Sequence, residues 1–255
     1  MRSLYPTPLQ LRSQVASFLN ATKLSVAESL SSAGASEAFR EIYKLSLTTH
    51  TELGGLGGSG LRPAVAPARN ITVRIPVLIG TGQFSVAEVE LRRFVELIVW
   101  TIYFTDHPVE WEHFIDGTRG FSQDSRRPIS FASHRELSFY TEYAFELMER
   151  EPSGLGTTAL SNLKQALHRL NSNVHAGHLA TLTSAIPPHD EMDEASLRSF
   201  SKIQRLSFAN CCLLLAAYRR KKFDRMQAIA RDHFDWLMGP KLRKDLRKGP
   251  FGIDR

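Results

Sequence analysis

The sequence predicts a mainly α-helical protein, a helical bundle with a minor β strand or hairpin near residues 70–80. Apolar residues recur at steps of three and four along much of the chain, which is the repeat of an amphipathic helix. Two strongly apolar runs, 94–104 and 208–218, are each about eleven residues long, well short of the roughly 20 residues that cross a bilayer. We therefore expect both runs to form buried core helices.

Composition and charge restrict the class of protein. The chain has 255 residues, 42% of them hydrophobic and 23% charged, which is ordinary for a globular domain. No signal-peptide pattern or spanning segment is visible, so we expect a cytoplasmic protein that does not associate with membranes. Cys211 and Cys212 point about 100° apart on a predicted helix, which disfavours a disulfide between them and predicts buried thiols.

The order of elements along the chain follows from periodicity and from breaks. Helices are predicted over about 9–20 and 26–49, and a Gly/Pro-rich stretch then interrupts the pattern. That stretch has no Gly-Lys-Ser or Gly-Lys-Thr after its glycines, which excludes a phosphate loop. The β-branched, partly alternating run 71–79 predicts the strand, which Pro76 restricts to a sheet edge. Further helices are predicted over about 85–105, 133–149, from 157 or 158 onward, 193–218 and 223–238.

These elements give a predicted division into four parts. Residues 1–53 form an N-terminal helical segment, and residues 54–69 form a Gly/Pro-rich linker or loop. Residues 70–238 form the helical core domain, and residues 239–255 form a basic C-terminal tail.

The predicted helix within 159–180 carries the candidate catalytic residues Arg169, Asn171 and His175. Leucines 163, 167 and 170 draw an apolar stripe, and a polar stripe that includes His168, Asn171, His175 and His178 lies roughly 90° away. Arg169 lies on the other flank, so a straight helix keeps it away from His175. A helix end at Ala176-Gly177, a local bulge or a second copy of the helix would bring the two together.

The Arg169–His175 spacing resembles the signature of the HEPN superfamily, in which a histidine follows an arginine after four to six residues. The resemblance extends over residues 85–220 in the order of helices, although Leu170 stands where the family commonly has a polar residue. It implies an all-α, homodimeric, metal-independent endoribonuclease with no cofactor, acting on RNA as a toxin or antiviral defence effector beside a partner protein. Arg169 would hold the phosphate, His175 would exchange protons with the RNA, and Asn171 would orient them.

Two other interpretations of the predicted helix within 159–180 stay open. His168, His175 and His178 lie close to one line and have the chemistry of zinc ligands, but no carboxylate joins them and we expect no metal site. The same polar residues also suit a helix–helix boundary. On α-helical spacing, Arg92 and Glu96 are predicted to form an ion pair beside this helix.

Basic residues are concentrated in the C-terminal third of a chain whose formal net charge is +6. The candidate nucleic-acid contacts are Arg219, Arg220, Lys221 and Lys222, with Arg126 and Arg127 in a middle loop. Such residues bind phosphates and carry no base readout. The alternative function is therefore a non-catalytic helical subunit that binds a partner protein or nucleic acid through this basic third.

Overall fold

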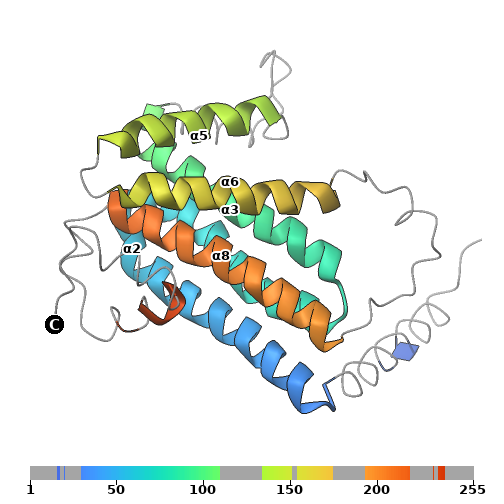
Figure 1. The fold of residues 1–255 in the computed structure, drawn as a ribbon. Coiled ribbons are helices and arrows are strands. Elements are labelled where there is room, and N and C mark those ends of the chain that lie inside the picture. Colours follow the sequence, from blue (N-terminus) through green and yellow to red (C-terminus); the bar gives the residue numbers. More distant parts are fainter. Residues whose placement is uncertain are drawn as a thin grey trace, which may run out of the picture.

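The computed structural model describes residues 16–17, 20, 30–109, 134–150, 154–174, 193–218, 232 and 235–238. The helices in these ranges are α2 (Ala33–Gly80), α3 (Phe84–Asp106), α5 (His134–Glu149), α6 (Leu155–Val174) and α8 (Glu194–Tyr218), as labelled in Figure 1. The mainly α-helical prediction is confirmed. No strand occurs among the residues that the structure describes.

Helix α2 doubles back on itself. A straight helix would separate Phe39 from Gly80 by about 60 Å at 1.5 Å per residue. Instead, a Cβ added to Gly80 would lie 3.4 Å from the ring of Phe39, and one added to Gly54 would lie 3.5 Å from the guanidinium of Arg69. The chain therefore reverses direction between Gly54 and Arg69, within the glycine-rich stretch, and α2 has two antiparallel arms (Figure 1).

A polar cluster connects the two arms. The Arg69 guanidinium donates to Nε2 of His50 at 2.9 Å, so the ring proton belongs on Nδ1, which faces the Arg69 carbonyl at 3.1 Å. The hydroxyl of Thr72 lies 3.3 Å from the same Nδ1 and donates to the Arg69 carbonyl at 2.7 Å. These bonds set the register in which the arms pair.

The predicted strand near residues 70–80 is wrong, because these residues form the second arm of α2. Ile71, Ile75 and Ile79 are buried at four-residue spacing, which is one face of a helix. Burying each isoleucine contributes about 1.5–3 kcal/mol, whereas strand propensity spans only about 1 kcal/mol per residue. Packing of the helical face therefore outweighs the local preference of β-branched residues.

The predicted linker, residues 54–69, has helical backbone within the bounds of α2, although the chain reverses there. Buried side chains from both sides of this stretch, such as Ile42 and Phe94, belong to one hydrophobic cluster that includes residues of every labelled helix. The predicted tail, residues 239–255, lies outside the described residues.

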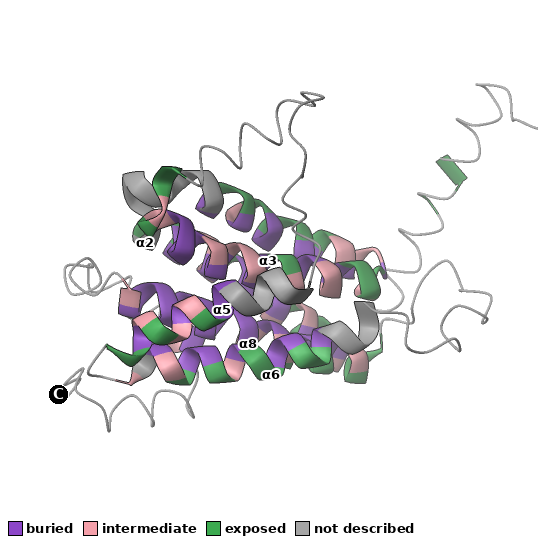
Figure 2. Ribbon diagram, turned by 90° about the horizontal axis from the view of Figure 1, so that it is seen from above, coloured by how far each residue is buried: buried purple, intermediate pink, exposed green. Residues whose placement is uncertain are grey.

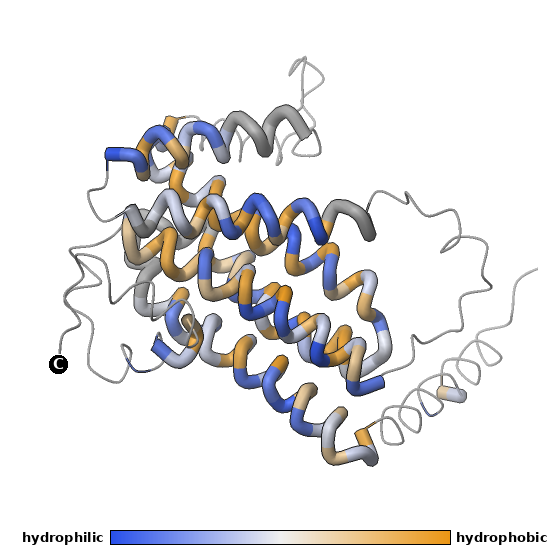
Figure 3. Tube along the Cα trace, in the orientation of Figure 1, coloured by the Kyte–Doolittle hydropathy of each residue, from blue (hydrophilic) through white to orange (hydrophobic). Residues whose placement is uncertain are grey.

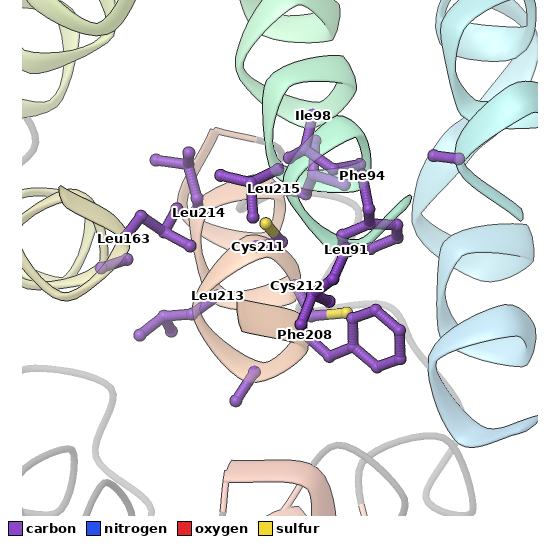
Figure 4. Packing of buried hydrophobic residues seen from close by; sticks show 14 of the residues in the cluster. Leu91, Phe94, Ile98, Leu163, Phe208, Cys211, Cys212, Leu213, Leu214 and Leu215 are labelled. Atoms are coloured by element: carbon purple, nitrogen blue, oxygen red, sulfur yellow. The ribbon is translucent and has the colours of Figure 1, made fainter. Parts of the chain in front are cut away.

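Helix α8 lies at the centre of the bundle, where it packs against α2, α3 and α6. Its residues from Phe208 to Ala217 are buried on all sides, which confirms the prediction for this apolar run. Figure 2 shows buried positions on the facing sides of the helices, and Figure 3 shows hydrophobic positions recurring along each helix. Phe94 and Phe208 pack with their ring centroids 4.6 Å apart (Figure 4). The run at 94–104 is likewise buried in α3.

The first arm of α2 runs parallel to α8. Gly34 contacts Glu194 at the start of both helices, and the side-chain amide of Gln204 donates to Ser46 Oγ at 2.8 Å further along. Arg205 pairs with Glu41 at 3.1 Å. Within the described part of the chain, no helix combines the length and apolar character needed to cross a membrane.

Candidate active site

Helix α6, which carries Arg169, begins at Leu155, two to three residues before the predicted start at Thr157 or Thr158. Gly154 has a positive φ of 68°, a conformation that favours glycine and turns the chain into the helix. The hydroxyls of Thr157 and Thr158 both donate to the Gly154 carbonyl at 2.9 Å. The two threonines therefore lie in the first turn of α6 and bond back to the residue before it, and neither is the predicted N-cap.

The buried face of α6 is the leucine stripe. Leu163 and Leu170 are almost fully buried and Leu167 nearly so, which confirms this stripe. The side-chain amide of Asn162 donates to Oδ1 of Asn210 on α8 at 3.0 Å. This bond and the leucines fix the rotation of α6 about its axis, and Arg169 is consequently exposed to solvent.

Only part of the predicted catalytic set lies among the described residues. His168 and Arg169 are both exposed on the penultimate turns of α6. Asn171 is helical, but its side chain is not among those described, and His175 and His178 lie outside the described residues. The meeting of Arg169 with His175 stays a prediction.

The predicted nucleic-acid contacts also lie outside the described residues. These are Arg219, Arg220, Lys221 and Lys222, which follow the last residue of α8, and Arg126 and Arg127, which lie between α3 and α5.

The predicted ion pair on α3 is confirmed. Nε of Arg92 lies 2.8 Å from Oε1 of Glu96, and the two side chains are only 13% and 14% exposed. A charge-assisted hydrogen bond between two mostly buried groups satisfies both charges. Helix α3, which carries this pair, packs against α6 as well as against α2, α5 and α8.

A second polar cluster, which the sequence did not predict, joins the ends of α3 and α8 to the interior of α5. Asp106 at the end of α3 accepts a hydrogen bond from Tyr143 of α5 at 2.8 Å and from Tyr218 of α8 at 2.7 Å. His107 stacks on Tyr103 with ring centroids 4.1 Å apart, and its Nδ1 donates to the Tyr103 carbonyl at 2.9 Å. The spacing of Tyr143 from Asp106 along the chain gave no signal for this contact.

The electrostatics of this cluster indicate a structural role. Burial, the hydrogen bond to Asp106 and the charge of Asp106 together raise the pKa of Tyr143 to about 12. Each carboxylate oxygen of Asp106 accepts a hydrogen bond from one tyrosine hydroxyl, so Asp106 holds both hydroxyls in place. It also fixes Tyr218, which directly precedes the basic residues 219–222.

The two cysteines are free and buried, as predicted, and burial raises the pKa of both thiols. A buried thiol with a raised pKa is a poor nucleophile. Across the described ranges, no three His, Cys, Asp or Glu side chains gather closely enough to hold a metal ion.

Comparison with protein-family models, with curated proteins and with solved structures found no match to this chain.

Proposed function

We propose that this protein is a metal-independent endoribonuclease similar to HEPN proteins, with its active site at the C-terminal end of α6. The observation that carries the proposal is the position of Arg169, an exposed residue near the C-terminal end of α6 in a mainly helical bundle. The buried leucine stripe of α6 lies on another face of the helix and leaves Arg169 on an exposed one. The polar residues Asn171 and His175 follow it in the sequence.

In the proposed reaction the ribose 2′-hydroxyl is the nucleophile. His175 takes the proton of this hydroxyl as its oxygen attacks phosphorus, and the bond from phosphorus to the 5′-oxygen breaks. The leaving 5′-oxygen receives a proton from the imidazolium, and the products carry a 2′,3′-cyclic phosphate and a 5′-hydroxyl. Arg169 stabilises the added negative charge through two hydrogen bonds, and Asn171 orients the pair. DNA is not a substrate, because it lacks the nucleophile.

The proposal extends to assembly and context. A homodimer would place two copies of α6 at one cleft and would bring Arg169 close to a His175. A role as a toxin or antiviral defence effector with a partner protein follows from the resemblance. The basic residues 219–222, 126 and 127 would bind the RNA backbone in a salt-dependent manner.

The test is incubation of the purified protein with RNA in EDTA. We expect cleavage products that end in a cyclic phosphate, and no cleavage of RNA whose 2′-hydroxyls are methylated. His175→Ala should abolish cleavage, while His168→Ala, which removes an exposed histidine from the same helix, should retain it. Arg169→Lys keeps the charge but loses the paired hydrogen bonds, so its rate should fall at least about tenfold, or about 1.4 kcal/mol.

The alternative function makes the opposite prediction. A non-catalytic subunit would keep its binding in the Arg169→Ala and His175→Ala variants and would lose it when residues 219–222 are changed to glutamate. Equal and undetectable cleavage by the natural protein and by His175→Ala would refute the nuclease.

A further inference from the structure

The outer face of α2 carries a group of exposed apolar side chains. Tyr43, Leu47 and Val73 are each 55% exposed, and Val77 is 63% exposed. Exposed apolar residues are unremarkable singly, but a contiguous group marks an interaction surface. These four residues form such a surface if the two arms of α2 bring them side by side.

The register of the two arms places them side by side. His50 lies opposite Arg69, and Phe39 lies opposite Gly80. Each residue of the first arm therefore lies opposite a residue of the second arm, and the two residue numbers of such a pair add up to about 119. Within one residue, this pairing sets Tyr43 opposite Val77 and Leu47 opposite Val73, one helical turn apart on each arm.

The direction of the side chains also favours one surface. On the first arm, Tyr43 and Leu47 lie about 20–60° from His50, which faces the second arm. On the second arm, Val73 and Val77 lie about 40–80° from Arg69, which faces the first. All four therefore flank the seam between the arms on its solvent side. We call these four residues the α2 apolar face.

The charges beside this face are mostly positive. Arg40, Lys44 and Arg74 are exposed on its outer edges. Arg40 pairs with Glu37 at 3.3 Å and Arg74 with Glu90 at 4.0 Å, whereas Lys44 lies over the ring of Trp236, so these three cations exceed the two carboxylates by one charge. A second copy of the chain would bring a similar excess of cations against this one, and like charges across an interface disfavour association. A partner with carboxylates beside an apolar stripe would complement both features.

We propose that the α2 apolar face binds an amphipathic helix of a partner protein, with aliphatic residues on the bound side and carboxylates flanking them. A third helix laid along the seam would present anchors at i, i+3 or i+4, and i+7. The face is separate from Arg169, because α3 and α8 lie between α2 and α6 (Figures 1 and 2). The proposal therefore does not depend on nuclease activity.

The test uses a synthetic helical peptide with leucines at i, i+4 and i+7 and glutamates beside them, labelled for fluorescence anisotropy. The full chain should bind it with a Kd on the order of 10 µM or tighter. Leu47→Asp and Val73→Asp should each weaken binding more than tenfold. Val109→Asp, at a 65% exposed valine beyond the end of α3, is the matched control and should leave binding unchanged.

A second pair of measurements separates recognition from misfolding. The combined variant Arg40→Glu/Arg74→Glu should bind the glutamate peptide at least tenfold more weakly and should bind a peptide with lysines in place of the glutamates more tightly. A misfolded variant would lose binding to both peptides and would not come to prefer the lysine peptide over the glutamate peptide.

Three results would overturn the proposal. Equal binding of the glutamate and lysine peptides would show that the α2 apolar face does not recognise carboxylates. Sedimentation of the natural chain as a dimer that Leu47→Asp dissociates would assign the face to a second copy. Binding to vesicles of anionic lipid that the same substitution abolishes would assign it to a membrane surface.

Discussion

Glu52 should make the protein less stable as the pH rises through neutrality. Its side chain lies in the first arm of α2, is 1% exposed, and is close enough to Cys212 that its charge raises the pKa of that thiol. Burial raises the pKa of Glu52 from 4.5 to about 7. The folded protein therefore keeps a proton at pH 6 that the unfolded chain has released.

The sign and size of the effect follow from this difference. Below pH 4.5 Glu52 is protonated in both the folded and the unfolded state, so it contributes no pH dependence to the free energy of unfolding there. Between 4.5 and about 7 the folded state binds more protons, so the free energy of unfolding falls as the pH rises. The total loss is about 3 kcal/mol, since each unit of difference corresponds to about 1.4 kcal/mol. Above about 7 the loss is constant.

Glu52→Gln tests this reasoning, because glutamine has the same shape and does not ionise. Urea unfolding followed by circular dichroism should give similar stabilities for variant and natural protein at pH 4.5. At pH 8 the variant should be more stable by up to about 3 kcal/mol. Glu37→Gln, at an exposed position of the same helix, is the control for the substitution itself. A difference between Glu52→Gln and the natural protein that stays constant from pH 4.5 to 8 would refute the raised pKa.

Three further substitutions probe the packing and the polar clusters. Phe208→Ala should lower the free energy of unfolding by about 3–5 kcal/mol in urea titration, because a fully buried ring is lost; a cost below 1 kcal/mol would contradict the packing. Arg92→Met removes the guanidinium beside the mostly buried Glu96 and should cost about 2–3 kcal/mol, and adding Glu96→Leu should recover most of it. Asp106→Asn should lower the pKa of Tyr143 from about 12 toward 10 in a phenolate absorbance titration, with burial keeping it above 10; no change would exclude the carboxylate as a cause.

The sequence allowed the main helices to be predicted where burial and periodicity agree. Residues 94–104 and 208–218 are apolar on nearly every side, which only a central helix accommodates, and both are buried. The start of α6 follows directly on Gly154, whose positive φ breaks the chain there, within three residues or so of the predicted start. The Arg92–Glu96 pair could be predicted because both partners lie on one helix face. Each of these features depends on residues close together in the sequence.

The contacts of the candidate sites could be predicted only in part, because they join distant segments. Asp106 is 37 residues from Tyr143 and 112 residues from Tyr218. No local pattern relates these positions, so their contact emerges only from the packing of α3, α5 and α8. For Arg169, the sequence predicts the exposed helical position, since the leucine stripe fixes the opposite face. The approach of His175 depends on the backbone after Val174, and the helical repeat alone does not determine it.

The wrong strand prediction and the proposed binding face have a common cause. In residues 71–79, Ile71, Ile75 and Ile79 lie four apart, a spacing that fits both the two-residue repeat of a strand and the helical repeat. Val73 and Val77 fit only the strand repeat. Once burial of the isoleucines makes this segment helical, the two valines must be exposed, at 55% and 63%. A helix that serves only to cover a core has no need of valines there, and polar residues with higher helix propensity would be more stable. Local sequence that conflicts with the fold tends to occur at functional surfaces. The two exposed valines therefore support the proposed binding face on α2.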